Sequence, residues 1–358
     1  MLPACDPTLT PDPPTPLPYT VTSFATAHTR TLAATEGAPD PDNITWHGRE
    51  VAVPQDEEGN PIVLGLPHVA RVAVGQRHAC AISTTGTVHC WGDHTGGALG
   101  AHRRCTTTDG GGKDCVLGQD MMPTLPQMRA IAAGDDVTCA VALDDDRVMC
   151  WGAASRSGGS SVGELEKPVP VTAGGAPLAA DRVLAFGGDV CAIDRQQVLW
   201  CWGDHFGALP MRQPQQGVVD VAIGRRHSCI IDANGLACWG DNTNAQISGD
   251  VAAARRCGAR CVVDAPAHVD LGGSPVRVVV GELHTCALSS AGDVSCWGSN
   301  EVGQLGRDDV FLVGGIAPIL SGIAELGAGY SHSCALGRDR SLWCWGSTTQ
   351  FDPSETAR

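Results

Sequence analysis

Cysteine is the residue type whose number and spacing most directly suggest chemistry in this sequence. Six Cys-Trp-Gly triplets occur along the chain, and another cysteine lies 9 to 11 residues before each of them. Such pairs could bind zinc or form disulfides, but zinc ribbons use closely spaced Cys-x₂₋₄-Cys knuckles. We therefore predict six disulfides: Cys80–Cys90, Cys139–Cys150, Cys191–Cys201, Cys229–Cys238, Cys286–Cys296 and Cys334–Cys344.

The segment between each pair of cysteines has the pattern of a β-hairpin. Residues 79–82 form the first strand of one example, residues 83–86 its turn, and residues 87–91 its second strand. This arrangement places residue 80 opposite residue 90, within the Cα separation that a disulfide tolerates. Each such loop contributes about 2–3 kcal/mol of stability in the chain-entropy description.

Histidine recurs at a fixed place in four of the six copies. The upstream cysteine there ends a Gly-x-x-His-x-Cys phrase, which contains His78, His227, His284 or His332. A set of imidazoles could bind metal or transfer protons. Because each histidine belongs to a different copy, we expect it instead to be hydrogen-bonded within its own unit. The tryptophans are expected to pack between adjacent units.

Enzyme signatures are missing from the sequence. It contains no Gly-x-Ser-x-Gly elbow, no phosphate-binding loop and no His-Glu-x-x-His helix. The run 144–146 of three aspartates falls in a hairpin turn, so a solvated turn is favoured over a metal site. The run 109–114 lacks the alternating acidic ligands of a calcium loop. We expect no catalytic residue, no cofactor and no metal.

The copies are internal repeats, and they are similar to the regulator-of-chromosome-condensation repeat. The resemblance is carried by Gly-Glu-Leu-His-Thr-Cys-Ala-Leu at 281–288 and by Val-Ser-Cys-Trp-Gly-Ser-Asn-Glu-Val-Gly-Gln-Leu-Gly at 294–306. It implies an all-β, seven-bladed β-propeller of four-stranded blades, with six blades as the alternative. The regular cysteine pairs resemble those of secreted bacterial members.

The N-terminal region is interpreted as a degenerate seventh copy that lacks both cysteines. Arg30 takes the first cysteine place and Thr45 the second, before Trp46. We further expect residues 16–21 to complete the last blade and close the ring. The predicted division is residues 1–18 as a tether and 19–358 as a single propeller, with copies at roughly 21–68, 69–128, 129–181, 182–218, 219–275, 276–321 and 322–358.

Composition limits the classes of function. The chain has 358 residues and a formal net charge of −15, which disfavours binding to the phosphate backbone of nucleic acids. No run of about 18 apolar residues is present, so nothing is expected to span a bilayer. The 17 cysteines suggest an oxidising compartment outside the cytoplasm.

Two copies contain long insertions after the tryptophan strand, and each insertion begins with Arg-Arg-Cys. We predict a disulfide within each insertion, Cys105–Cys115 and Cys257–Cys261. Both insertions should project from the same face of the disc, where a disulfide would restrict the loop and lower the ordering cost of binding. Candidate partner contacts are Arg103, Arg104, Arg255 and Arg256. The alternative is that these arginines only solubilise the loops or pair with nearby aspartates.

One cysteine is left over once the pairs are assigned. Cys5 follows Leu-Pro-Ala, which resembles the lipobox of a bacterial lipoprotein, and a proline-rich stretch follows it. The basic and hydrophobic region of a signal peptide does not precede it. We interpret Cys5 as a lipidation site and expect the start to have been assigned too late. An incidental free cysteine is the alternative.

Together these features predict a non-catalytic, extracytoplasmic binding scaffold. It would be a monomer, held at the outer membrane or cell surface by lipid or else secreted, and it would contact a protein or a surface polymer through loops on one propeller face. The alternatives are a lyase or glycosidase that acts on the propeller face, and a purely structural component of the envelope.

Overall fold

Short antiparallel strands joined by turns make up the computed structural model of the chain. The structure describes residues 20–27, 30–36, 44–47, 69–93, 96–100, 105–107, 113–117, 125–153, 165–250, 261–307, 312–313, 316 and 318–347. Strands, turns and bends account for the secondary structure of these residues, and helices are absent from them. No helix in this part of the chain could therefore cross a bilayer.

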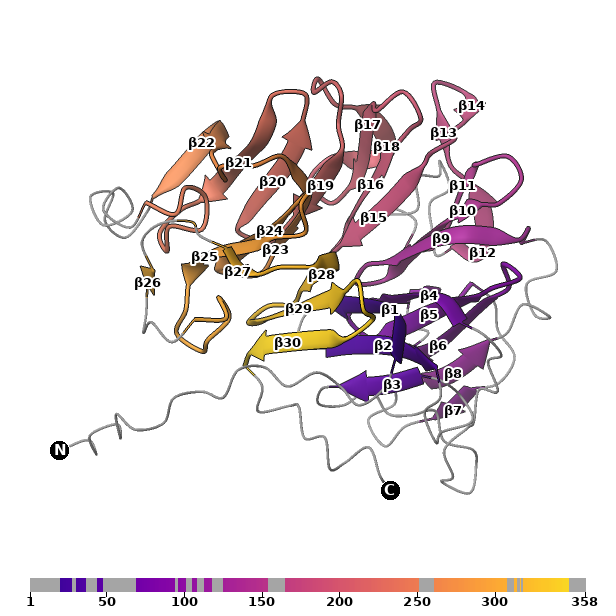
Figure 1. Cartoon of the computed structure of the whole chain (residues 1–358). Helices are drawn as coiled ribbons and strands as arrows, with labels where there is room; N and C mark the ends of the chain where they lie inside the picture. The colour runs from indigo at the N-terminus through magenta and orange to yellow at the C-terminus, as the bar shows by residue number, and fades with distance from the viewer. Residues whose placement is uncertain are drawn as a thin grey trace.

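Three sheets consist of four strands each, in simple antiparallel order (Figure 1). Each begins with an inner strand and ends with an outer strand. The first contains β9 (Met128–Ala133), β10 (Val137–Ala142), β11 (Val148–Gly152) and β12 (Leu165–Pro170). The second contains β15 (Arg182–Phe186), β16 (Asp189–Ile193), β17 (Leu199–Gly203) and β18 (Gly207–Arg212). The third contains β19 (Asp220–Ile223), β20 (His227–Asp232), β21 (Gly235–Asp241) and β22 (Val262–Val269).

Three further sheets repeat the same hairpin with a different outer part. One contains β4 (Val69–Val74), β5 (His78–Ser83), β6 (Val88–Asp93), β8 (Lys113–Leu117) and β7 (Cys105–Thr107). Another contains β23 (Pro275–Val280), β24 (His284–Ser289) and β25 (Val294–Ser299), and its β25 pairs with both β26 (Leu312–Val313) and β27 (Pro318–Leu320). The last contains β28 (Ile323–Ala328), β29 (His332–Gly337) and β30 (Leu342–Gly346). A separate small hairpin pairs β13 (Thr172–Ala173) with β14 (Ala176–Pro177).

The N-terminal segment forms a three-stranded sheet of β1 (Thr20–Ala27), β2 (Arg30–Glu36) and β3 (Ile44–His47). Its strand β1 contacts both β28 and β4, so this sheet lies between the last sheet and the first cysteine-bearing one. The all-β propeller is thereby confirmed, and six blades carry the cysteine hairpin, in agreement with the six-bladed alternative. A seventh blade with four strands stays a prediction, because residues 48–68 lie outside the described residues.

Two details of the N-terminal copy were predicted wrongly. Val21 lies in β1 and not in an outer strand of the last blade; its N–H donates to the carbonyl of Arg340 at 3.0 Å. The register pairs Leu32 with Trp46 and Ala33 with Thr45, so Ala33, not Arg30, occupies the first cysteine place. The prediction was wrong because this copy lacks the histidine and cysteine that fix the alignment elsewhere. Residues 16–19 lie outside the described residues.

The six predicted hairpin disulfides are present. Each joins residues that face each other directly across two antiparallel strands, with Cα atoms 4.1 to 4.2 Å apart. The close spacing is that of a non-hydrogen-bonded pair, where side chains of neighbouring strands approach most nearly. The same register determines which residues of the two strands face each other at the next two positions of every cysteine-bearing blade. Ala79 faces Trp91 and His78 faces Gly92 in the first of them.

Glycine after the tryptophan is required by the backbone. Gly298 has a φ of +113°, a conformation that L side chains rarely adopt, and a Cβ at this position would lie 2.6 Å from the carbonyl oxygen of Leu283. The equivalent glycine in each of the other five cysteine-bearing blades also has positive φ and the same kind of backbone contact. The hairpin and the preceding turn can approach this closely only without a side chain.

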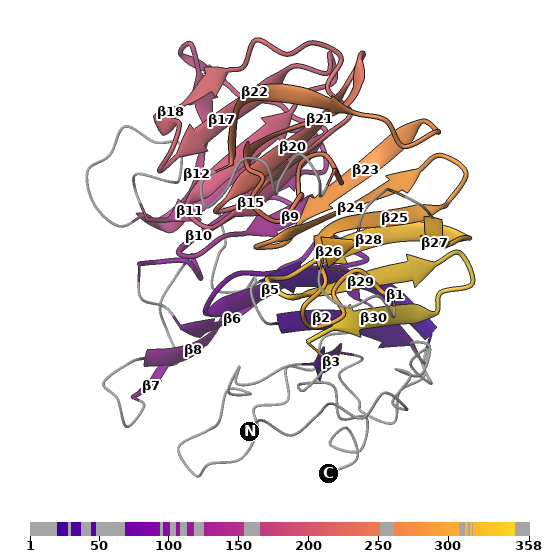
Figure 2. The ribbon, with the colours of Figure 1, turned by 90° about the vertical axis from the view of Figure 1, so that its left-hand side faces the viewer.

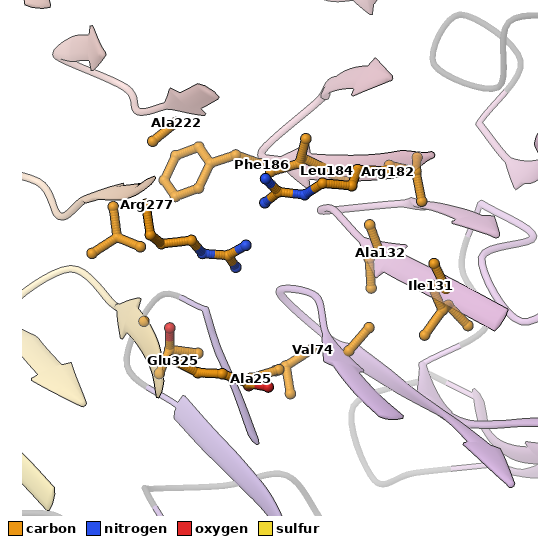
Figure 3. A pocket seen from close by; sticks show the side chains of 18 of the residues that line it. Ala25, Val74, Ile131, Ala132, Arg182, Leu184, Phe186, Ala222, Arg277 and Glu325 are labelled. Carbon is orange, nitrogen blue, oxygen red and sulfur yellow. The ribbon is translucent and has the colours of Figure 1, made fainter. Parts of the chain in front are cut away.

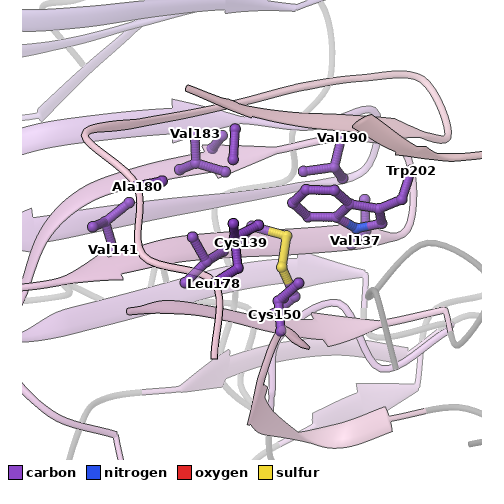
Figure 4. Packing of buried hydrophobic residues seen from close by; sticks show 13 residues of the cluster. Val137, Cys139, Val141, Cys150, Leu178, Ala180, Val183, Val190 and Trp202 are labelled. Atoms are coloured by element: carbon purple, nitrogen blue, oxygen red, sulfur yellow. A yellow bond between two sulfur atoms is a disulfide. The ribbon is translucent and has the colours of Figure 1, made fainter. Parts of the chain in front are cut away.

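The hydrophobic core lies between adjacent blades, as predicted for the tryptophans. Trp202 of β17 is fully buried beside Val190 of its own blade and beside Val141 and the Cys139–Cys150 disulfide of the preceding blade (Figure 4). The clusters around Trp151, Trp297 and Trp345 are built in the same way, each tryptophan packing on the blade before its own. Each indole thus buries a large apolar area at a junction between blades.

Three of the repeated histidines connect neighbouring blades, which corrects the expectation of a bond within one blade. Their Nε2 atoms lie 2.7 to 2.8 Å from hydroxyl oxygens, in the pairs His78–Thr138, His227–Thr285 and His284–Ser333. These hydroxyls in turn donate to the backbone carbonyls of Ala98, Gln246 and Gln304. Because a hydroxyl has one proton to donate, the imidazole Nε2–H must be the donor to it. We call each such group a histidine latch.

The latch is missing on both sides of the blade formed by β15–β18. At one junction Val137 takes the place of the histidine, and Val190 of the next blade takes the place of the hydroxyl residue. Both side chains are apolar. At the other junction Asp189 takes the place of the histidine. Its Oδ2 lies 2.6 Å from the imidazole Nδ1 of His205 in its own blade. This blade is therefore held to its neighbours by apolar packing and by other polar contacts.

Burial keeps His227, His284 and His332 neutral. Loss of hydration lowers the pKa of His284 to about 3, with smaller contributions from His227 and His332, and it lowers the pKa of His227 and His332 to about 4. In the unfolded chain these histidines titrate near pH 6.5. The folded state therefore binds fewer protons between these values, and the stability that the neutral histidines provide is lost as pH falls from 6.5 toward 4.

Replacing His284 with Gln should make stability less dependent on pH. The native protein should lose about 1.4 kcal/mol per pH unit for each buried histidine in this window. His284→Gln should melt below the native protein at pH 7.5 but show a shallower decrease of Tm down to pH 4.5. His268→Gln, at an exposed side chain of β22, is the matched control and should retain the native slope. A native slope in His284→Gln would contradict the assignment.

Candidate functional site in the central cavity

A cavity of about 530 Å³ lies on the axis of the propeller. The inner strands β1, β4, β9, β15, β19, β23 and β28 all contribute to its wall (Figure 3). Inner strands of successive blades run in the same direction, so residues at the same register form one level of the wall. The chemistry of the cavity therefore depends on which residue each blade supplies at a given level.

The two ends of the cavity differ in polarity. The C-terminal ends of the inner strands supply mostly apolar side chains, among them Val74, Ala133, Phe186, Ile223 and Val280. Near the N-terminal ends, five blades carry a charged residue at the same register position. Its partner on the second strand is the residue two positions after the first cysteine of the hairpin. These residues are Arg71, Arg182, Asp220, Arg277 and Glu325. We call them the charged ring.

Asp220 is the buried centre of the charged ring. Its side chain is fully buried, and its Oδ1 lies 2.7 Å from Nη2 of Arg182. Its Oδ2 accepts a hydrogen bond from the N–H of Val278 at 2.9 Å and lies 3.8 Å from Nε of Arg277. The carboxylate thus links β19 to β15 on one side and to β23 on the other. A buried carboxylate of this kind is tolerated because it is paired and hydrogen-bonded.

Three guanidinium groups of the ring influence one another. Burial lowers the pKa of Arg182, and the charges of Arg277 and Arg71 lower it further, while Asp220 opposes the change. Figure 3 shows the guanidinium groups of Arg182 and Arg277 extending into the cavity from different walls. Glu325 lies 3.9 Å from Nη1 of Arg71, which is 57% exposed. The ring therefore has three positive and two negative side chains.

A neighbouring network corrects the interpretation of the aspartate run 144–146 as a solvated turn. Asp146 is buried and has a positive φ of 58°. Its carboxylate accepts a hydrogen bond from Nε of Arg129 at 2.9 Å and pairs with Arg195 of the next blade. Arg129 also donates to the carbonyls of Ala180 and Asp181. Asp144 and Asp145 remain turn residues, but Asp146 joins two blades.

The loop residues predicted as partner contacts lie outside the described residues. This holds for Arg103, Arg104, Arg255 and Arg256, and also for Cys5 and Cys257. The backbone register of β7 and β8 places Cys105 opposite Cys115, which is the arrangement that the predicted disulfide requires. Cys261 is disulfide-bonded. In the part of the chain that the structure describes, no group of His, Cys, Asp or Glu side chains is arranged to hold a metal ion.

The charged ring was missed by sequence reasoning, although a signal for it was present. A charged residue opens the β-branched run before the histidine phrase in several copies, as in Arg182-Val183, Asp220-Val221 and Arg277-Val278. Read one copy at a time, each is an ordinary strand residue. Only the alignment of all copies shows that these side chains share one level of the axis.

Stacked hairpin blades around a charged axial cavity define a repeat propeller, a class whose members differ mainly in their loops and cavity walls. The family model for the regulator of chromosome condensation (RCC1) repeat matches residues 69–97, 218–246, 276–304 and 323–350. The chain therefore contains RCC1 repeats, and its repeat hairpins carry disulfides.

Curated relatives share the repeats at modest identity. Protein pim1 of Schizosaccharomyces pombe is 26% identical over 275 residues, which are 67% of this chain and 49% of pim1. The human E3 ubiquitin-protein ligase HERC2 is 28% identical over 263 residues, which are 66% of this chain and 5% of HERC2. The chain thus spans about half the length of pim1 and a small part of HERC2.

Solved structures share the fold. Human WBSCR16 superposes with a TM-score of 0.72 at 18% identity, covering 90% of this chain and 88% of that one. Yeast RCC1 (Prp20), in its structure bound to Kap60, gives a TM-score of 0.62 at 19% identity, covering 82% of this chain and 71% of that one. At these identities the likeness establishes the propeller fold alone.

Replacing Asp220 with Asn should destabilise the protein strongly. The change removes a fully buried carboxylate from its ion pair with Arg182, whose side chain is 31% exposed, and breaking a buried ion pair costs about 3–5 kcal/mol. Asp181→Asn is the matched control, because this side chain is 57% exposed beside Arg129 and exposed pairs contribute about 1 kcal/mol or less. Urea unfolding with the disulfides intact gives both values. Equal losses in the two variants would show that Asp220 has no special role.

Proposed function

We propose that this RCC1-repeat propeller is a non-catalytic binding scaffold for a protein or a surface polymer. The observation that carries the proposal is the placement of the two Arg-Arg-Cys insertions. One follows Gly100 and the other follows Asp250, and both precede the outer part of their blades. A solved relative offers support, since the Prp20p structure from Saccharomyces cerevisiae is described with its binding properties to Gsp1p and histones.

The topology supports a common face for the two insertions. In an antiparallel blade, the connections from the first to the second strand and from the third to the fourth lie at the same end of the strands. Both insertions belong to the second kind of connection. The flanking strands therefore support a position for them on the face opposite to the charged ring. Strands β7 and β8 extend one insertion at the periphery of the molecule (Figures 1 and 2).

The proposed contact uses the paired arginines of these insertions. Arg103, Arg104, Arg255 and Arg256 would meet carboxylates of a partner through bidentate hydrogen bonds. Disulfides at the base of each insertion would reduce the entropy lost on binding. The two insertions belong to blades three apart along the chain, so a partner that contacts both would lie across the face of the disc.

The proposed location is extracytoplasmic. Six hairpin disulfides support it, because such bonds form and persist in oxidising compartments. Attachment through lipid at Cys5 is the second part of this proposal, and it rests on the Leu-Pro-Ala-Cys sequence. An exported, disulfide-bonded chain would not meet a cytosolic GTPase, so nucleotide exchange is disfavoured as its activity.

Removing the paired arginines should abolish partner capture. In a pull-down from the cell envelope of the source organism, Arg103→Ala/Arg104→Ala and Arg255→Ala/Arg256→Ala should each lose at least one partner that the native protein retains. Arg212→Ala/Arg338→Ala removes the same charge from exposed positions at the opposite end of the strands, in β18 and in the turn between β29 and β30, and should lose none. Retention of every partner by both loop variants would exclude the loops as the contact.

Lipidation of Cys5 should be visible by mass spectrometry of the protein isolated from its own cell envelope. The expected species begins at Cys5 and carries diacylglycerol, and Cys5→Ser should move the protein into the soluble fraction. A mature N-terminus that retains an unmodified Met1 would rule the anchor out.

A further inference from the structure

The charged ring contains guanidinium groups whose hydrogen-bonding capacity is unused. Each arginine has five N–H donors. Within the described residues, Arg277 has only the 3.8 Å contact from its Nε to Asp220, and Arg71 has only the 3.9 Å contact from its Nη1 to Glu325. Both distances exceed that of a charge-assisted hydrogen bond. The terminal nitrogens of both side chains are therefore available to a molecule in the cavity.

The position of these donors suits a ligand with more than one acidic group. Arg71 lies on β4 and Arg277 on β23, and the strands β28 and β1 separate them along the wall. Both face the same cavity of about 530 Å³, which is large enough for a small organic molecule or the tip of a peptide loop. One carboxylate cannot satisfy both guanidinium groups fully, but two linked carboxylates can.

The carboxylates of the ring decide the net charge that a ligand meets. Asp220 is paired with Arg182 and accepts a hydrogen bond from the N–H of Val278, and Nε of Arg277 lies 3.8 Å from it. Glu325 is the ring carboxylate that competes for Arg71, and at 40% exposure it can move away from it. The cavity wall also includes Arg129, Asp181 and Asp189. Arg129 pairs with Asp181, and Asp189 pairs with His205. The ring itself has three arginines against two carboxylates, on a chain whose formal net charge is −15. The partly enclosed wall increases the effect of the ring's charges, since screening by water is weaker there.

We propose that the charged ring is a binding site for ligands with two neighbouring carboxylates, which Arg71 and Arg277 hold from opposite sides of the cavity. The ligand is either a free dicarboxylate or tricarboxylate or a pair of acidic side chains on a loop of a partner. Arg182 and Asp220 position the site, because their pairing fixes the inner strands β15 and β19. The site uses none of the loop arginines, so its test is independent of the test of the proposed partner contact.

Isothermal titration of the purified, oxidised protein tests the proposal with defined probes. Citrate represents the free acids, and a blocked peptide with two adjacent glutamates represents a partner loop. Arg71→Gln and Arg277→Gln should each weaken binding of the responsive probe about tenfold, the value of one charge-assisted hydrogen bond. Arg212→Gln makes the same charge change on the exposed surface of β18 and should leave the affinity unchanged.

Glu325→Gln tests whether a variant can also increase the affinity. It removes the competing carboxylate and frees Arg71, so the affinity for the acidic probe should rise several-fold. If Glu325 had a purely structural role, the affinity would be unchanged or lower. Binding of citrate alone identifies free acids as the ligand, and binding of the peptide alone identifies a partner's acidic loop. No binding of either probe, equal binding of inorganic phosphate or of a glutamine peptide, or equal weakening by Arg212→Gln would overturn the proposal.

Discussion

The close approach of two strands at the cysteine positions is the constraint on which the rest of the blade depends. At that pair the Cα atoms are only 4.1 to 4.2 Å apart, and the register that it fixes places tryptophan and then glycine on the neighbouring pairs. The glycine lets the preceding turn fold back on the strand. The histidine opposite it can then reach the next blade. Disulfide, core and junction are consequences of one alignment of two strands.

Much of the blade could be predicted because its signals are local. The cysteine spacing, the turn between the strands and the triplet around Trp297 lie within about 20 residues of sequence, and they gave the hairpins and their disulfides. The same reasoning failed at Ala33, where the marker residues are absent. It also assigned each histidine to its own blade, because the hydroxyl that accepts its hydrogen bond lies some 50 to 60 residues away along the chain.

The candidate site could not be predicted for a related reason. The charged ring forms from single residues of different blades, such as Arg182, Asp220 and Arg277, and none of them is part of a motif in its own copy. Their common role is visible only in the closed propeller, where residues at the same register position of different inner strands lie around one axis. Asp146 is a similar case. Its sequence predicts a solvent-exposed turn, and its partners Arg129 and Arg195 are distant in sequence.

The absence of histidine latches around the β15–β18 blade makes the propeller mechanically uneven. A closed ring of equal junctions shares a deformation among all of them, whereas unequal junctions concentrate it at the softest. Apolar packing at Val137 and Val190 allows sliding more readily than a directional chain of hydrogen bonds does. Breathing of the ring is therefore expected to be larger at this blade, which contributes Arg182 to the axial cavity, than at the three latched junctions.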